Sequence, residues 1–161
     1  MRPATRPLSI SCLMLAYALF APPAIAFDAS VATRLDARGI QYVVDEDGDY
    51  KVTYNYSQEG RSQLVFVSGG TESVAGFRVR EVFAPAARVA ADGINGPVAL
   101  ALLADSSSNK LGAWEIRGDV LYFVIKLPDG IDAAQLEAAM DIAAQTADDK
   151  EIEFSGDRDD L

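Results

Sequence analysis

Three aspartates at alternate positions form the part of the sequence that comes nearest to a metal-binding pattern. Asp45, Asp47 and Asp49 match the spacing of ligands 1, 3 and 5 in the calcium loop of an EF-hand. The match stops there, because Tyr50 takes the sixth position, where the loop needs glycine, and Tyr56 takes the twelfth, where it needs glutamate. An aspartate–glycine pair is typical of a solvated turn leading into a strand. The segment is therefore predicted to be a turn, with weak Ca²⁺ binding as the alternative.

Four aromatic residues are the candidates for a binding face: Tyr54, Tyr56, Trp114 and Tyr122. Rings that alternate along strands can contact a sugar or a peptide, and their polar atoms can hydrogen-bond to it. The same arrangement also packs a core and leaves the hydroxyl groups in water. Both interpretations are open from the sequence.

Catalytic residue types are scarce. The chain has no histidine, and its one cysteine is Cys12. The usual nucleophilic triads and dyads and the usual zinc sites need these residues. Ser68-Gly69-Gly70 runs into another predicted strand, so it is no phosphate-binding loop. Carboxylates are plentiful, but no apolar setting singles out a pair for acid–base catalysis. The sequence predicts no catalytic, metal-binding or cofactor-binding residue, and hence no enzyme.

Residues 1–26 have the features of a secretory signal peptide. Arg2 and Arg6 supply the positive charge, residues 8–20 form an apolar run, and Ala24-Ile25-Ala26 is a small-x-small cleavage pattern. An apolar helix of that length spans about 20 Å, less than the roughly 30 Å of a bilayer core. We expect cleavage after Ala26, no stable membrane insertion afterwards, and a periplasmic or secreted protein.

The mature chain is strongly acidic. Removing Arg2 and Arg6 from the 14 basic side chains leaves 12 against 24 acidic ones, a net charge of −12. Nucleic acids and anionic membrane surfaces need clustered Lys and Arg, so neither is an expected partner. The charge favours solubility, and it leaves attraction to a basic protein as an alternative.

Periodicity divides the mature chain into helices and strands. Helices are predicted at 30–38, after a cap at Asp28 or Ser30, at 97–107, with Leu100, Leu103 and Ala104 buried, and from Asp132, with Gln135 completing a capping box. Strands are predicted at 50–56, 61–68, 75–83, 111–116 and 120–127, with a loop at 84–96. Gly118-Asp119 suits a type II′ hairpin. Residues 27–150 are thus expected to form one α+β domain, followed by an acidic C-terminal tail at 151–161.

Residues 35–54, 102–128 and 131–148 carry a resemblance to a family. In their order of helix, acidic turn, strands and small-residue helices they resemble the YbjN-domain proteins, whose fold is similar to that of type III secretion chaperones. The resemblance implies the order α-β-β-β-α-β-β-α, with helices on an antiparallel sheet of about five strands. It also implies a sensory-transduction regulator of a Gram-negative bacterium and a non-enzymatic, peptide-binding homodimer. The export signal departs from the cytoplasmic secretion chaperones.

Together these observations predict an exported, non-enzymatic module of the cell envelope that binds a protein or peptide. Two alternatives stay open. One is a periplasmic binder of glycans or small molecules that uses the same aromatic residues. The other is an acidic inhibitor of a basic hydrolase, whose binding would weaken sharply with salt.

Overall fold

The computed structural model describes residues 28–58, 60–156, 158, 159 and 161. The predicted signal peptide at 1–26 and its cleavage after Ala26 lie outside these residues. Within the described part of the chain, no helix combines the length and the apolar character needed to cross a membrane.

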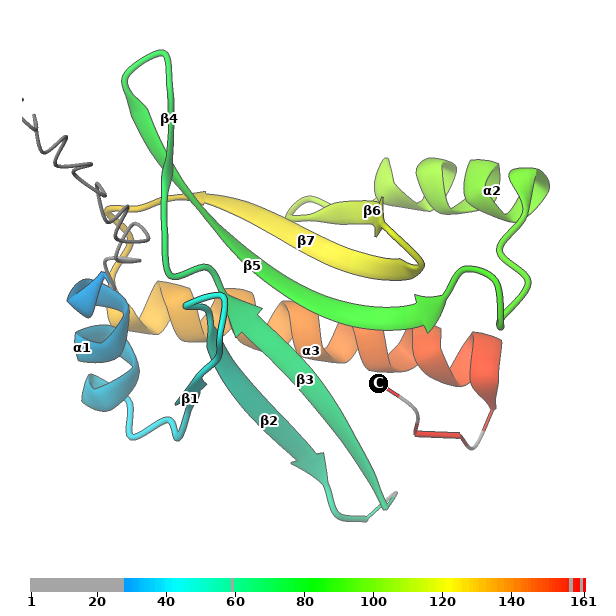
Figure 1. Cartoon of the computed structure of the whole chain (residues 1–161), viewed down its shortest axis with the longest axis horizontal. Coiled ribbons are helices and arrows are strands. Elements are labelled where there is room, and N and C mark those ends of the chain that lie inside the picture. Colours follow the sequence, from blue (N-terminus) through cyan, green and yellow to red (C-terminus); the bar gives the residue numbers. More distant parts are fainter. Residues whose placement is uncertain (1–27, 59, 157, 160) are drawn as a thin grey trace, which may run out of the picture.

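The described residues form three helices and seven strands, arranged as a sheet with helices packed on it (Figure 1). The helices are α1 (Ala29–Ala37), α2 (Gly96–Ser106) and α3 (Ala133–Ser155). The strands are β1 (Val43–Val44), β2 (Tyr50–Tyr56), β3 (Arg61–Val67), β4 (Glu72–Val74), β5 (Phe77–Arg88), β6 (Ala113–Arg117) and β7 (Val120–Pro128).

The sheet is antiparallel throughout, in the order β1-β2-β3-β5-β7-β6, and β4 pairs with the first residues of β5. The predicted α+β class and element order are confirmed. The sheet has seven strands where about five were expected, because β1 and β4 are only two and three residues long. Runs this short show no periodicity in a sequence.

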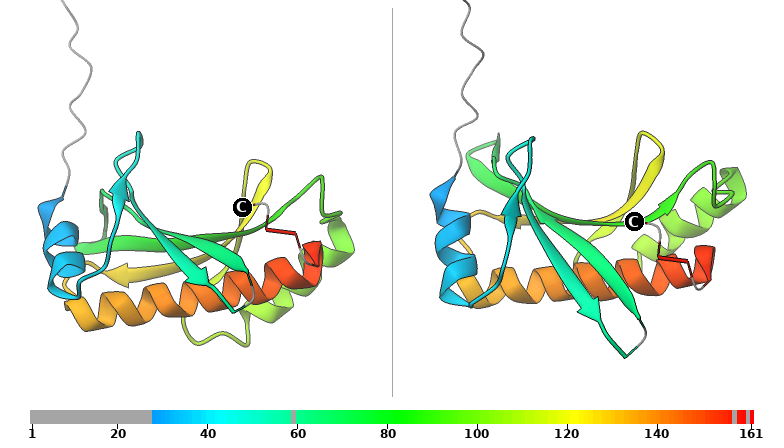
Figure 2. Two further views of the ribbon diagram at one scale, coloured as in Figure 1. Left: turned by 90° about the horizontal axis from the view of Figure 1, so that it is seen from below. Right: turned by 60° about the horizontal axis from the view of Figure 1, so that its bottom comes forward.

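Helix α3 runs along one side of the sheet, against β3, β5 and β7 (Figure 2). Its start is the predicted capping box: the Asp132 carboxylate accepts from the Gln135 backbone N–H, and the Gln135 side chain accepts from the Asp132 N–H. Half of its eight buried residues are alanine, and the others are Leu136, Met140, Asp148 and Glu151. Small side chains let the helix lie close to the buried valines of β3 and β5.

Strand β5 is longer than predicted. The segment from Ala84 was expected to be a loop, but β5 continues to Arg88 and pairs with β7 along the whole way. The register shifts between Pro85 and Ala87. Proline has no N–H to donate and is tolerated in a sheet at such an irregularity. The alanine and proline of this segment thus resemble a loop in the sequence while forming the buried centre of the sheet.

Helix α2 is found where it was predicted, but its buried face was predicted wrongly. Leu100 and Leu103 are each 67% exposed, and Leu102 is the buried leucine. Leu102 packs toward Trp114 and Leu121. The helix carries apolar residues on all of its sides, so helical periodicity alone cannot show which side faces the sheet.

Helix α3 continues past the predicted domain end at 150. The acidic tail expected from residue 151 is helical as far as Ser155, and Gly156 caps the helix with a positive φ of 65°. The added turn is held because the buried Glu151 pairs with Arg61 of β3 at 2.8 Å. A distant arginine therefore extends a helix that its own acidic sequence leaves undetermined.

Candidate functional site

The face of the sheet opposite α3 carries no described helix (Figure 2). Alternation along a strand places every second side chain on this open face. Phe66 of β3, Phe83 of β5 and Tyr122 of β7 lie there side by side, from three adjacent strands. We call these three residues the aromatic row.

The rings of the aromatic row contact one another. The ring centroids of Phe66 and Phe83 are 5.2 Å apart with an interplanar angle of 9°, and Phe83 meets Tyr122 edge-on at 5.8 Å. The guanidinium of Arg117 lies 5.4 Å from the Phe83 centroid and 6.0 Å from that of Tyr122. Half-buried rings on an open sheet, covered in part by a cation, form a preorganised apolar platform.

Four charged side chains border this platform. Arg117 pairs with Glu81 at 2.9 Å and with Glu115 at 2.8 Å, and Lys126 pairs with Glu115 at 2.5 Å. Partial burial opposes the charged form of Glu115, but hydrogen bonds from Lys126 and Arg117 outweigh it and lower its pKa. The cluster therefore holds two anions and two cations at neutral pH. Such a neutral, alternating rim can hydrogen-bond both N–H and C=O groups of an arriving chain.

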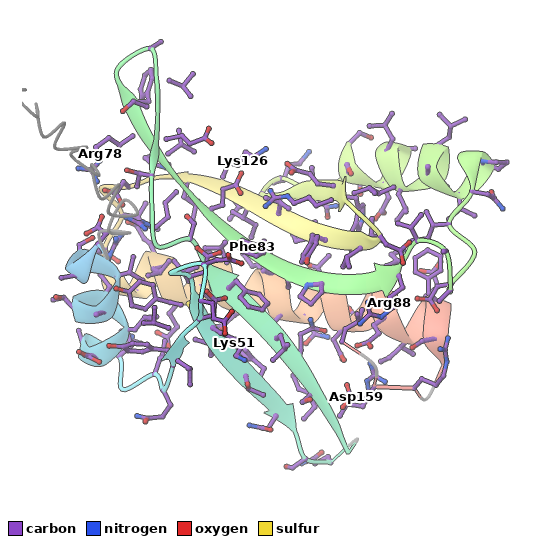
Figure 3. All side chains as sticks on the ribbon, in the orientation of Figure 1. Lys51, Arg78, Phe83, Arg88, Lys126 and Asp159 are labelled. Carbon is purple, nitrogen blue, oxygen red and sulfur yellow. The ribbon has the colours of Figure 1, made fainter. Side chains whose placement is uncertain are left out.

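A groove of about 870 Å³ continues from this charged rim. Val74, Phe77 and Val79 of the β4–β5 hairpin line it, and Glu81 and Lys126 belong to both the groove and the rim. Figure 3 shows Phe83 where β3 meets β5, with Lys126 on the neighbouring β7. The groove and the aromatic row thus form one continuous surface, which we call the open-face site.

The four aromatic residues predicted for a binding face do not share one face. Tyr54 lies toward α3, where its hydroxyl donates to the Asp141 carboxylate at 2.9 Å, and Tyr56 alternates to the same side of β2. Trp114 is only 9% exposed, meets Phe123 edge-on at 5.0 Å and donates to Asp105. Only Tyr122 lies on the open-face site.

Phe66, Phe83, Arg117 and Lys126 belong to the site and were not singled out from the sequence. A signal was present, since Phe83 alternates with the buried Val82 and Phe66 with the buried Val65 and Val67. Without the sheet order, however, alternation cannot show that β3, β5 and β7 are neighbours.

The acidic segment at 45–49 is a turn, as predicted. The Asp45 carboxylate accepts from the backbone N–H groups of Asp47 and Asp49 at 3.0 and 2.9 Å, and Asp49 accepts from Gly69 N–H at 2.9 Å. These carboxylate oxygens thus fix the backbone at the start of β2 and after the end of β3. Among the described residues, no group of three or more His, Cys, Asp or Glu side chains is arranged to hold a metal ion.

Replacing Asp49 by asparagine is expected to stabilise the protein at pH 7. Burial, with Asp45, Asp47 and Glu81 nearby, raises the pKa of Asp49 despite its hydrogen bond from Gly69. Because the pKa of the Asp49 carboxyl is higher in the folded protein than in the unfolded chain, stability is lost as the pH rises from the ordinary pKa of 3.8 through the pKa of the folded state. The amide oxygen of the introduced side chain can still accept from Gly69 without that penalty.

We expect a gain on the order of 0.5 kcal/mol in the free energy of unfolding, small because solvent screens the partly exposed group. Urea titrations at several pH values measure it. The gain in stability of Asp49→Asn should vanish at pH 3. The control Asp47→Asn, in the same turn, should change the free energy of unfolding little. A loss of stability at pH 7 would contradict this account of Asp49.

A second apolar surface lies on α2. Leu100 and Leu103 are each 67% exposed, and Ile116 of β6, which lines a small pocket together with Leu103, is 48% exposed. The homodimer implied by the family resemblance stays a prediction.

No family model matches the chain, and no curated protein matches it. Among solved structures, the chain is similar to one in the "Structure of the HopA1-SchA Chaperone-Effector Complex", with a TM-score of 0.53 and 10% sequence identity. The likeness covers 74% of this chain and 88% of that chain. At this identity it establishes the fold, which is α+β and chaperone-like.

Proposed function

We propose that this protein is a non-enzymatic module of the cell envelope that binds an extended protein or peptide segment on its open-face site. The observation that carries the proposal is a helix-free sheet face on which an aromatic row, a charge-balanced rim and a groove of about 870 Å³ form one surface among the described residues. A chaperone-like fold, found in a solved chaperone–effector complex, supports a binding role.

The site suits an extended chain because its parts follow one another across the strands. Phe66, Phe83 and Tyr122 offer ring faces and edges to apolar side chains. Phe77 is 69% exposed at the groove, where a partner's side chain would cover it. Burial of these rings would supply the affinity, and the rim charges would fix the orientation of the bound segment.

The finer parts of the proposal rest on the sequence. They are membership of the YbjN-domain family, a regulatory or chaperone-like role, and a periplasmic or secreted location after removal of residues 1–26. The charge of −12 on the mature chain supports a protein partner over nucleic acid. The glycan binder and the acidic hydrolase inhibitor are the alternatives that the experiment below separates from it.

Phe83→Ala is expected to reduce partner binding at least about tenfold, because Phe83 is the ring that contacts both others and truncation of a central aromatic commonly costs about 2 kcal/mol or more. The assay captures proteins from envelope extract on immobilised residues 27–161, at low and moderate salt, with mass spectrometry. Ile142→Ala, an exposed position on α3, is the matched control.

We expect a defined protein bound to the wild type and the control at both salts, and lost with Phe83→Ala. If binding is lost at moderate salt but is not changed by Phe83→Ala, the result would instead support the acidic inhibitor. Retention of glycan fragments without any protein would support the small-ligand alternative.

A further inference from the structure

Strands β3 and β5 separate from each other after a short contact. Their paired residues are Phe66–Phe83 and Val67–Val82, followed by one bond from Ser68 N–H to the Glu81 carbonyl, whereas β3 pairs with β2 over all of its seven residues. In Figure 1 the β2–β3 hairpin swings away from β5. The edge of β3 that faces this split, from Arg61 to Val65, therefore has no neighbouring strand among the described residues.

Residues that follow α3 lie against this free edge. The backbone N–H and the hydroxyl of Ser62 donate to the Asp159 carboxylate at 3.1 and 3.2 Å. The adjacent Arg61 donates from Nη1 to the backbone carbonyl of Arg158 at 3.0 Å. Figure 3 places Asp159 near the free edge of β3. Two successive residues of β3 thus bind a carbonyl and a carboxylate from two successive residues of another segment.

The donor Arg61 is held rigidly for this contact. Its side chain is only 7% exposed, and α3 fixes it through Asp148 at 3.0 Å and Glu151 at 2.8 Å. Burial opposes its charge, but the bond to Asp148 and the two acidic neighbours outweigh it and keep its pKa raised. Because the guanidinium fork is planar, fixing two of its nitrogens aims the third at the position of the Arg158 carbonyl.

An independent sign of an incomplete site lies one residue further along β3. The Gln63 side chain is fully buried, and its amide nitrogen donates to the carbonyls of Leu64 and Pro85 at 3.1 and 2.8 Å. Gln63 bridges the split in this way. Its Oε1 is the one buried side-chain polar atom without a hydrogen bond in the described structure. An unsatisfied buried acceptor is unfavourable, and an N–H from a chain in the split would satisfy it.

We propose that the free edge of β3 is a second binding site, which takes an extended acidic segment of a partner through a carbonyl at Arg61 and an aspartate carboxylate at Ser62. The chain's own Arg158 and Asp159 occupy it as an internal competitor. Because the chain's own segment is tethered, its effective concentration at the site is in the millimolar range. A partner segment present at a lower concentration must therefore bind more tightly than Arg158 and Asp159 to displace them. The site shares no residue with the open-face site, and the two proposals stand or fall separately.

The first test is amide hydrogen exchange of Ser62, followed by NMR on residues 27–161. Asp159→Ala removes the carboxylate that accepts from the Ser62 N–H, so exchange at Ser62 should accelerate at least about tenfold. Asp149→Ala removes one exposed carboxylate from α3 and is the matched control, with no change expected at Ser62. Unchanged exchange in Asp159→Ala would overturn the assignment of Asp159 as the occupant.

The second test adds the segment back as a separate molecule. A synthetic peptide with the sequence of residues 156–161 is titrated into the Asp159→Ala protein while the Ser62 and Arg61 signals are recorded. We expect these signals to return toward their wild-type positions at millimolar peptide, and to move at least about tenfold less in the wild type. The same peptide with Asp159→Ala should have little effect. Equal shifts from both peptides, or none from either, would overturn the site.

Discussion

Replacing Arg61 by alanine is expected to lower the free energy of unfolding by about 3–5 kcal/mol. Arg61 is the cation between Asp148 and Glu151, both nearly inaccessible to water on α3. Without it, two buried carboxylates lose their partner, and the last turns of α3 lose their link to β3. Urea denaturation followed by circular dichroism measures the loss. Arg88→Ala, on the exposed end of β5, should stay within about 0.5 kcal/mol of wild type.

The reason for the Arg61 effect can be separated from loss of packing. In an Arg61→Met protein, the added changes Asp148→Asn and Glu151→Gln remove the uncompensated charges and should recover part of the lost stability. If these changes lower stability further, the buried charges are not the cause of the effect.

Gly69→Ala is expected to cost about 2–4 kcal/mol, the second largest effect. A Cβ on Gly69 would overlap the backbone carbonyl of Gly48, far inside van der Waals contact. Backbone atoms cannot rotate away as a side chain can, so the turn before β2 must move. The hydrogen bond from Gly69 N–H to the Asp49 carboxylate would then be lost as well.

Gly70 provides the matched control for this prediction. A Cβ at Gly70 meets nothing within 4 Å. Gly70→Ala should therefore leave stability nearly unchanged, and the two variants differ only by one position in the chain. Thermal and urea unfolding of both proteins measures the difference. Equal stability of the two variants would show that the contact between Gly48 and Gly69 does not constrain the fold.

Local signals predicted much of the fold. Asp132 was recognised as a helix cap from residue type and spacing, and Asp28 was one of two candidates beside Ser30; both aspartates cap the helices that follow. The φ of Gly118 is positive, at 62°, and the φ of Asp119 is not positive, as the predicted type II′ turn requires. Such features depend on neighbours a few residues apart, and the sequence contains them directly.

Long-range pairing was not predictable in the same way. Arg80 alternates with apolar residues on β5, yet it is 1% exposed because Asp28 and Asp129, from two other segments, neutralise it at 2.5 and 2.7 Å. Arg61 and Glu151 are a similar case. A charged residue looks solvent-exposed in a sequence, and only its distant partners make its burial favourable.

The candidate site shows the same limit. Alternation along β2 placed Tyr54 and Tyr56 on one side, and the structure agrees, but that side faces α3. Tyr122 joins Phe66 and Phe83 only because β5 lies between β3 and β7 in the sheet. The residue types were visible in the sequence, whereas their assembly into one surface depended on strand order.

The most direct test of the open-face site is site-specific photo-crosslinking in envelope extract. A benzophenone amino acid replaces Tyr122 on the open face in one protein and Ile142 on the outer side of α3 in another. The proposed function predicts that one envelope protein crosslinks from position 122 and not from position 142, and that Phe83→Ala abolishes the crosslink. A partner that crosslinks only from position 142, or from both positions irrespective of Phe83, would contradict binding on the open face.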